Sequence, residues 1–117
     1  LNTYPQTLIA INVLGAALRG QGKLQEAVQA YDKAIRLNPD YAEAYNNLGV
    51  TLKELGRLAE AEAGYRKAIF LKNDYNPAIV GLGKVLMKKG QHKEGLANLR
   101  RGNGAIFFNF ENGVTIQ

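Results

Sequence analysis

The sequence predicts an all-α fold, a right-handed superhelical array of three helix-turn-helix hairpins followed by a short strand-like tail. Three observations support this fold class. The sequence matches itself at an offset of 34 residues, the apolar residues of each copy recur at the spacing of an α-helix, and a glycine stands at the same place in the middle of every copy. One hairpin of this length cannot bury its apolar face alone, so neighbouring hairpins are expected to stack into an open array.

The offset aligns glycines, leucines and acidic residues across all three copies. The aligned positions are Gly22, Gly56 and Gly90, then Leu14-Gly15, Leu48-Gly49 and Leu82-Gly83, and finally Glu26, Glu60 and Glu94. The alignment predicts repeats over residues 8–41 and 42–75 and a degenerate third repeat over 76–104. It assigns residues 1–7 to the end of a preceding repeat or to an N-terminal extension.

Each copy is expected to contain two helices joined by a turn. In the first copy, Ile11, Leu14 and Leu18 fall on one helical face, and a second apolar stripe that includes Tyr31 follows Gly22. Glycine is the usual residue after the last turn of a helix, because it adopts a left-handed backbone conformation without steric cost. The shared glycine is therefore predicted to mark the turn of each hairpin.

The second helix of the third copy departs from this pattern. Gly95 and Gly102 replace alanines, and each glycine costs about 1 kcal/mol relative to alanine inside a helix. We expect this helix to end near Arg101. His92 stands at its start, where the other copies have leucine, and is expected to make a partly buried contact between helices.

These residues resemble the tetratricopeptide repeat family. Its signature of Leu-Gly, alanine, an aromatic residue, alanine and proline is matched in the first copy by Leu14, Gly15, Ala27, Tyr31, Ala34 and Pro39. The second copy keeps all but the proline, and its residues 44–54 are similar to the superhelical arms of O-linked N-acetylglucosamine transferases and to bacterial multi-repeat proteins. The resemblance is to the arms and implies a module that binds other proteins, without catalysis.

Composition excludes several other classes of protein. The 117 residues are 46% apolar and 21% charged, which is typical of a folded chain, and they include no cysteine. Only one histidine is present, so we expect no metal site, no cofactor and no catalytic centre. The longest apolar run is far shorter than the roughly 20 residues that cross a bilayer, so we expect no membrane span and a cytoplasmic location.

The net charge of +5 comes from the C-terminal third of the chain. Residues 76–109 hold six Lys or Arg against one Asp or Glu. Nucleic-acid binding is not expected, because no motif for reading bases accompanies these cations. The excess favours a protein or peptide partner that carries acidic side chains.

The first helix of each hairpin is expected to line the concave side of the array, where a peptide segment or partner protein would bind. The predicted groove combines amides, apolar side chains and cations, namely Asn12, Arg19, Asn46, Asn47, Val50, Lys53, Val80, Lys84, Met87 and Lys88. Chaperone-binding relatives hold a C-terminal carboxylate with a clamp of Lys, Asn and Arg. Of the corresponding positions here, only Asn47 matches, so the resemblance does not extend to that clamp.

The residues after the third repeat read as a strand-like hairpin with a turn at Asn112-Gly113. Its apolar residues could serve as an oligomerisation surface, and they are Ile106, Phe107, Phe108, Phe110, Val114 and Ile116. An isolated hairpin is marginal in water, so three fates remain open. The tail covers the end of the array, pairs with another subunit through its edges, or begins a further domain.

The function predicted from sequence is therefore a non-catalytic interaction module that binds a peptide or partner protein in its groove. Two alternatives remain. The chain could form a homo-oligomeric scaffold through the end of the array and the aromatic tail, or it could be the recruiting arm of a larger enzyme.

Overall fold

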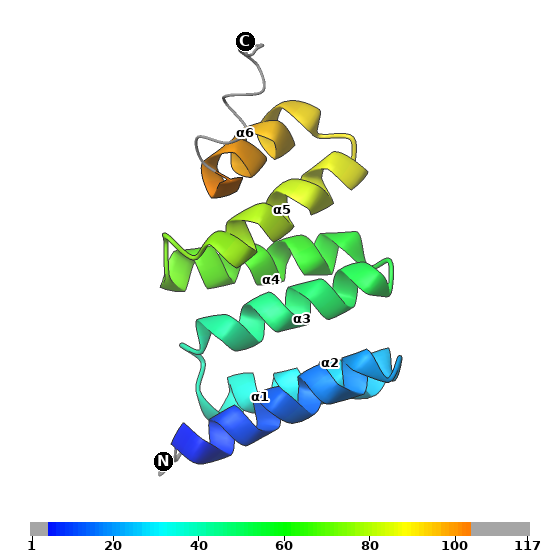
Figure 1. Ribbon diagram of the computed structural model, residues 1–117, viewed down its shortest axis with the longest axis vertical. Helices are drawn as coiled ribbons and strands as arrows, with labels where there is room; N and C mark the ends of the chain where they lie inside the picture. Colours follow the sequence, from blue (N-terminus) through cyan, green and yellow to red (C-terminus); the bar gives the residue numbers. More distant parts are fainter. Residues whose placement is uncertain (1–4, 104–117) are drawn as a thin grey trace.

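The computed structural model describes residues 5–103, and this part of the chain forms six α-helices arranged as three stacked hairpins (Figure 1). The first hairpin is α1 (Pro5–Gly20) and α2 (Leu24–Leu37), the second is α3 (Ala42–Glu54) and α4 (Leu58–Leu71), and the third is α5 (Asn76–Lys88) and α6 (His92–Asn103). The predicted all-α fold is confirmed. The predicted strand-like tail at 105–117 lies outside the described residues.

The glycine at the middle of each repeat makes the turn of its hairpin, as predicted. Gly22, Gly56 and Gly90 have φ values of 81°, 80° and 84°, in the left-handed region that side chains disfavour. In the first turn the Lys23 amide donates to the Leu18 carbonyl at 2.9 Å, and the Gly22 amide donates to the Arg19 carbonyl at 2.9 Å. These two bonds satisfy carbonyl groups that the end of α1 leaves without a partner in the helix.

The stack is curved because its two rows of helices pack differently. Successive first helices pack against one another, α1 with α3 and α3 with α5. Within residues 5–103 the backbones of the second helices α2, α4 and α6 stay farther apart, although the Arg66 side chain of α4 reaches Glu94 of α6. The first helices therefore form the inner side of the curve and the second helices the outer side. The molecule is elongated, with extents of 53 × 26 × 21 Å.

The core runs continuously from one hairpin to the next, and Tyr65 on α4 shows how. Its ring is 1% exposed and lies between two glycines. A Cβ atom on Gly49 would be 3.0 Å from the ring, and one on Gly81 would be 2.5 Å from the ring carbon that bears the hydroxyl. Glycine on both sides lets α3 and α5 approach the same aromatic ring, and this contact joins the second hairpin to the third.

Helix α1 begins at Pro5, three residues before the predicted start of the first repeat. Proline suits the first turn of a helix, because its fixed φ is helical and its missing amide hydrogen has no partner there anyway. Helix α6 ends at Asn103, slightly beyond the predicted end near Arg101, and is shorter than α2 and α4. None of the described helices is long and apolar enough to cross a bilayer.

Candidate binding surface on the inner face

Side chains of successive first helices meet on the inner face at a separation of one repeat plus one residue. The Asn47 amide donates to Oδ1 of Asn12 at 2.9 Å, and the Arg19 guanidinium donates to a carboxylate oxygen of Glu54 at 3.1 Å. Both pairs join α1 to α3 and are 35 residues apart in sequence. The junction between the first two hairpins is therefore both polar and charge-neutral on this face.

The second junction, between the second and third hairpins, differs. Both positions equivalent to the Arg19–Glu54 ion pair carry cations there. Lys53 stands one repeat after Arg19, and Lys88 stands one repeat after Glu54. Lys84 lies one helical turn before Lys88 on α5. We call Lys53, Lys84 and Lys88 the inner lysine cluster. The ion pair of the first junction is thus replaced at the second by charges of like sign.

Electrostatics at Lys53 reflect this arrangement. Partial burial lowers the pKa of the Lys53 ammonium, and the charges of Lys84 and Lys88 lower it further. Glu54 is the neighbouring carboxylate that opposes this effect, and it is already paired with Arg19. None of the ion pairs found among residues 5–103 involves a member of the inner lysine cluster. Within the described part of the chain, the three lysines therefore have no ion-pair partner of their own.

Apolar side chains flank the lysines. Val50 on α3 and Val80 and Met87 on α5 are half-buried, so each leaves part of its surface open to solvent. Asn46 was expected to be an accessible groove residue, but its side chain is only 7% exposed. Its Oδ1 is buried and has no hydrogen-bond donor among the described residues. The close packing of α3 against α5 accounts for this burial. Asn46 therefore contributes little surface to a ligand.

Two tyrosines pack below the inner face, Tyr31 against Gly15 and Tyr65 between Gly49 and Gly81, and the sequence analysis treated them only as core residues. The hydroxyl groups of Tyr31 and Tyr65 are buried and have no hydrogen-bond partner among the described residues. Burial, with the nearby charge of Glu54, raises the pKa of Tyr65 to about 12. Burial likewise raises the pKa of Tyr31, so both hydroxyls stay protonated at neutral pH.

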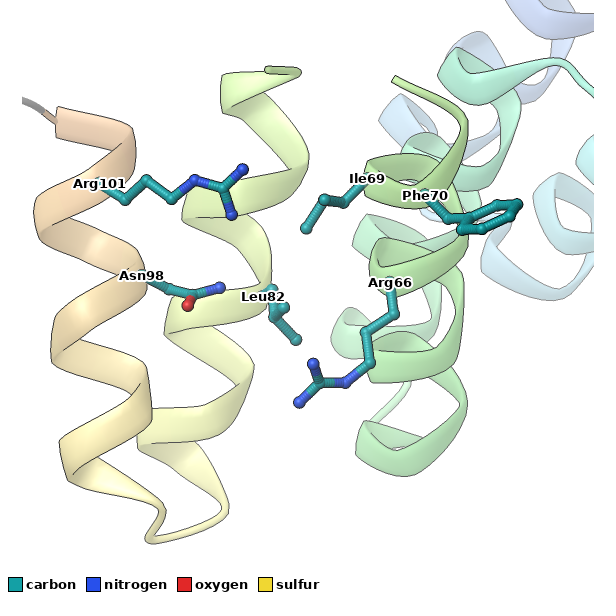
Figure 2. Close-up of a pocket in the computed structure, with 6 residues that line it drawn as sticks. All are labelled: Arg66, Ile69, Phe70, Leu82, Asn98 and Arg101. Atoms are coloured by element: carbon teal, nitrogen blue, oxygen red, sulfur yellow. The ribbon is translucent and has the colours of Figure 1, made fainter. Parts of the chain in front are cut away.

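The outer side of the array contains a separate cavity of about 270 Å³ between α4, α5 and α6 (Figure 2). Arg66, Ile69, Leu82, Asn98 and Arg101 line it, and Phe70, which also borders it, turns its ring away from the cavity. Both arginines already have partners. Arg66 donates to Glu62 and Glu94 at 2.9 and 3.0 Å, and Arg101 donates to the Asn73 carbonyl at 2.6 Å.

A second outer cavity of about 300 Å³ includes Leu48 and Gly64, which are the repeat equivalents of Leu82 and Asn98. Both cavities therefore reflect the spacing of stacked hairpins. They are a general feature of this array, whereas the inner lysine cluster is particular to the second junction.

Three further predictions concern residues away from the groove. The prediction that His92 is partly buried was wrong. His92 is exposed at the first residue of α6, because in the described part of the chain no later helix packs over it. Within residues 5–103 there is no group of three or more His, Cys, Asp or Glu side chains that could hold a metal ion. The predicted oligomerisation residues of the tail lie outside the described residues.

An array of helical hairpins with its first helices on a concave inner face defines a class of repeat proteins. The sequence matches the family model described as "TPR repeat" over residues 15–56 and the one described as "Tetratricopeptide repeat" over residues 42–75. The two matches together span more than half of the chain. The chain belongs to the tetratricopeptide repeat family, whose members serve as protein–protein interaction modules.

Solved structures of this family are similar to the chain. The crystal structure of MamA superposes with a TM-score of 0.77 at 29% identity over 81% of this chain, and the chain spans 56% of the MamA chain. The Arabidopsis OM64 TPR domain gives a TM-score of 0.80 at 25% identity, covering 83% of this chain and 80% of that one. No curated protein sequence matches.

A third similar structure contains a bound peptide. The second TPR of Spaghetti (RPAP3), bound to the HSP90 peptide SRMEEVD, superposes with a TM-score of 0.80 at 22% identity and covers 83% of this chain and 90% of that chain. At this level of identity the likeness concerns the fold.

Proposed function

We propose that the chain is a non-catalytic binding module that holds an acidic segment of a partner protein against its inner face, between α3 and α5. The observation that carries this proposal is the inner lysine cluster. The charges of Lys84 and Lys88 act on Lys53 at one junction, and none of the three lysines takes part in an ion pair found among residues 5–103. A ligand that brings carboxylates to this junction relieves the repulsion among the lysines and gains charge-assisted hydrogen bonds.

The surroundings of the cluster suit a peptide better than an isolated anion. Val50, Val80 and Met87 offer partly exposed apolar surface beside the lysines. The Asn12–Asn47 pair uses one donor and one acceptor, which leaves the side-chain carbonyl of Asn47 as an acceptor for a peptide backbone. Apolar, polar and charged contacts are thus available along one face.

The bound peptide of the RPAP3 domain supports a partner of this kind, because SRMEEVD contains three acidic residues. The proposed site nevertheless uses its own positions. In this chain Pro77 and Gly81 stand where the clamp of chaperone-binding relatives has its third-repeat cations. The inner lysine cluster lies nearer the C-terminal ends of α3 and α5. The partner is therefore proposed to present internal acidic side chains, with no need for a free chain end.

The test uses fluorescence anisotropy with two labelled peptides that differ only in having four consecutive glutamates or four consecutive glutamines. The chain is expected to bind the glutamate peptide more tightly, and the difference should shrink as salt is added. The double substitution Lys53→Glu with Lys84→Glu should weaken binding of the glutamate peptide about 10- to 100-fold.

The matched control is Lys23→Glu with Lys33→Glu, which changes the net charge equally but alters exposed lysines of the first hairpin. This control should change the affinity less than about threefold. Equal losses in the two double variants would show that the peptide responds to net charge alone, and the proposed site would be wrong.

A further inference from the structure

We propose that the inner face has a second subsite, formed by Tyr41, Glu43 and Tyr75, that binds a lysine or arginine side chain of the same partner. We call these three residues the aromatic–carboxylate cluster. The inference rests on the proposed function, because the partner is the acidic segment held by the inner lysine cluster. It adds that this segment carries a basic side chain about five residues from its acidic ones.

The first observation is that the cluster already holds an ammonium group of the chain itself. Nζ of Lys72 lies 4.9 Å from the centroid of the Tyr75 ring and 3.9 Å from a carboxylate oxygen of Glu43. Glu43 is in the first turn of α3, Lys72 directly follows α4, and Tyr75 directly precedes α5. An aromatic face beside a carboxylate attracts a cation both through the ring quadrupole and through opposite charge. Lys72 thus shows that a cation fits this place.

The contact that Lys72 makes is weak enough to be exchanged. The side chains of Lys72 and Glu43 are 51% and 46% exposed, and their charged atoms are 3.9 Å apart. An exposed pair at this distance contributes little, because water and salt screen it. The ammonium or guanidinium group of a partner can therefore take the place of Lys72, which then turns into solvent.

Both tyrosines of the cluster lie near the charge of Glu43. Tyr41 and Tyr75 occupy the same position of successive repeats, directly before α3 and α5, and both are half-buried. Burial raises the pKa of each hydroxyl, and the carboxylate of Glu43 raises each pKa further. A hydrogen bond with Asn12 acts on the Tyr41 pKa in the opposite direction, so the cluster lies beside the Asn12–Asn47 bond of the inner face.

The cluster and the inner lysine cluster lie on the same face of α3. Glu43, Asn46, Val50 and Lys53 follow one another at helical spacing, with Glu43 near the start of the helix and Lys53 near its end. Because an α-helix rises 1.5 Å per residue, these two charges are about 15 Å apart along the helix axis. The inner face therefore has an acidic, aromatic end and a basic end.

Helix α5 repeats this arrangement. Tyr75 precedes Lys84 by nine residues, which gives nearly the same separation along the helix. Val50 and Val80 are half-buried and offer apolar surface between the two ends. An extended peptide advances about 3.3 Å per residue, so about five residues connect the two subsites. The opposite charges also select one direction for the segment, because the reversed segment would bring carboxylates to Glu43.

Both subsites occur at the second junction. Ile9 stands one repeat before Glu43, and Pro77 stands one repeat after it, so neither equivalent position carries a carboxylate. The first junction likewise has an ion pair where the second has the inner lysine cluster. Two subsites of opposite charge that coincide at one of the two junctions favour a single partner segment that contacts both.

The test is fluorescence anisotropy with the glutamate peptide extended by four spacer residues and then either a lysine or a glutamine. The pair is made with the extension before the glutamates and again with it after them, because one direction is expected to fit. In that direction the lysine peptide should bind about three- to tenfold more tightly than its glutamine counterpart. Without the subsite, the added positive charge should weaken binding to the inner lysine cluster. A lysine directly beside the glutamates should give no gain, because it cannot reach Glu43.

The readout for variants is the ratio of the two affinities, lysine peptide over glutamine peptide. Glu43→Gln should bring this ratio to about one or below. The matched control is Asp74→Asn, which removes an exposed carboxylate directly before Tyr75 and should keep the ratio. Lys72→Gln removes the internal competitor and should raise the ratio, whereas Lys33→Gln, at an exposed position of α2, should not.

The possible failures are distinguishable. If the chain does not bind the glutamate peptide at all, the proposed function is wrong and the second subsite falls with it. If the glutamate peptide binds but the spaced lysine gives no gain in either direction, the inner lysine cluster stands and the second subsite is overturned. A gain that Glu43→Gln leaves intact, or a ratio that Lys72→Gln lowers, would also overturn the second subsite.

Discussion

Asn47 donates a 2.9 Å hydrogen bond to Oδ1 of Asn12 and so joins the first helices of two neighbouring hairpins on the inner face. Both amides are partly buried, and the bond links residues 35 positions apart. Asn47→Ala should lower the free energy of unfolding by about 1 kcal/mol, because it leaves Asn12 without this partner. Urea denaturation measures the change, and a double-mutant cycle with Asn12→Ala isolates the pair. Additive effects in the cycle would mean that the two amides do not interact.

The turn glycines provide a test of the hairpin geometry. Gly56 has a φ of +80°, so Gly56→Ala should cost about 1 kcal/mol of stability even though no atom lies within 4 Å of the new methyl group. Gly20→Ala is the matched control, since Gly20 lies in α1 with equally open surroundings. That substitution should raise the free energy of unfolding by about 0.5–1 kcal/mol. The opposite order of stabilities in thermal melts would contradict the assigned turn.

Glu62 predicts a dependence of stability on pH. The Glu62 carboxylate accepts hydrogen bonds from Lys89 at 2.6 Å and from Arg66 at 2.9 Å. Both bonds lower the pKa of Glu62 below its ordinary value of 4.5, and the bond from Lys89 has the larger effect. A lowered folded-state pKa stabilises the fold above the unfolded pKa, and the contribution is lost as pH falls through the folded value. Glu62→Gln should therefore cost about 1 kcal/mol at neutral pH and progressively less below pH 4.5. A difference that stays constant with pH would contradict the pairing.

Removing the buried hydroxyl of Tyr65 is expected to preserve or increase stability, unlike the loss of the Glu62 carboxylate. It has no hydrogen-bond partner among the described residues, so it costs desolvation without compensation. Tyr65→Phe should leave the free energy of unfolding unchanged or raise it by up to about 1 kcal/mol. Tyr65→Leu is the contrasting variant, because it removes the ring that fills the space beside Gly81 and should destabilise the fold. A loss of more than 1 kcal/mol in the phenylalanine variant would show that the hydroxyl is bonded.

The inner lysine cluster is expected to oppose stability while it serves binding. Lys84 and Lys88 are like charges one helical turn apart, and both lower the pKa of Lys53. Lys84→Gln should therefore raise the free energy of unfolding by about 0.2–0.5 kcal/mol and weaken binding of the glutamate peptide. Denaturation and anisotropy measure the two effects on the same variant. A variant that loses both stability and affinity would indicate that Lys84 has a structural partner.

The repeat period was sufficient to predict the six helices and their turns, because Gly22, Gly56 and Gly90 recur in register with a helical apolar pattern. The period alone also predicts which cations lie on the inner face. The pairing of residues 35 positions apart could not be predicted from the period, because it depends on how far one hairpin shifts along the next when they stack. Once Asn12 and Asn47 are seen to pair, the same offset relates Arg19 to Glu54.

Burial was harder to predict than position. Asn46 lies on a first helix, as its repeat position predicts, yet the close approach of α5 leaves its side chain only 7% exposed. His92 occupies a position that is half-buried at Leu24 and Leu58, yet it is exposed where the described array ends. Both cases depend on neighbouring hairpins, which a repeat pattern read one copy at a time does not contain.

We propose above that an acidic peptide binds the inner face at the second junction. Chemical-shift mapping by NMR of the labelled chain, titrated with the glutamate peptide, tests it most directly. We expect the largest amide shifts on α3 and α5 around Lys53 and Lys84, with little change on α4 and α6. The largest shifts around Arg66 and Arg101, beside the outer cavity, would contradict it.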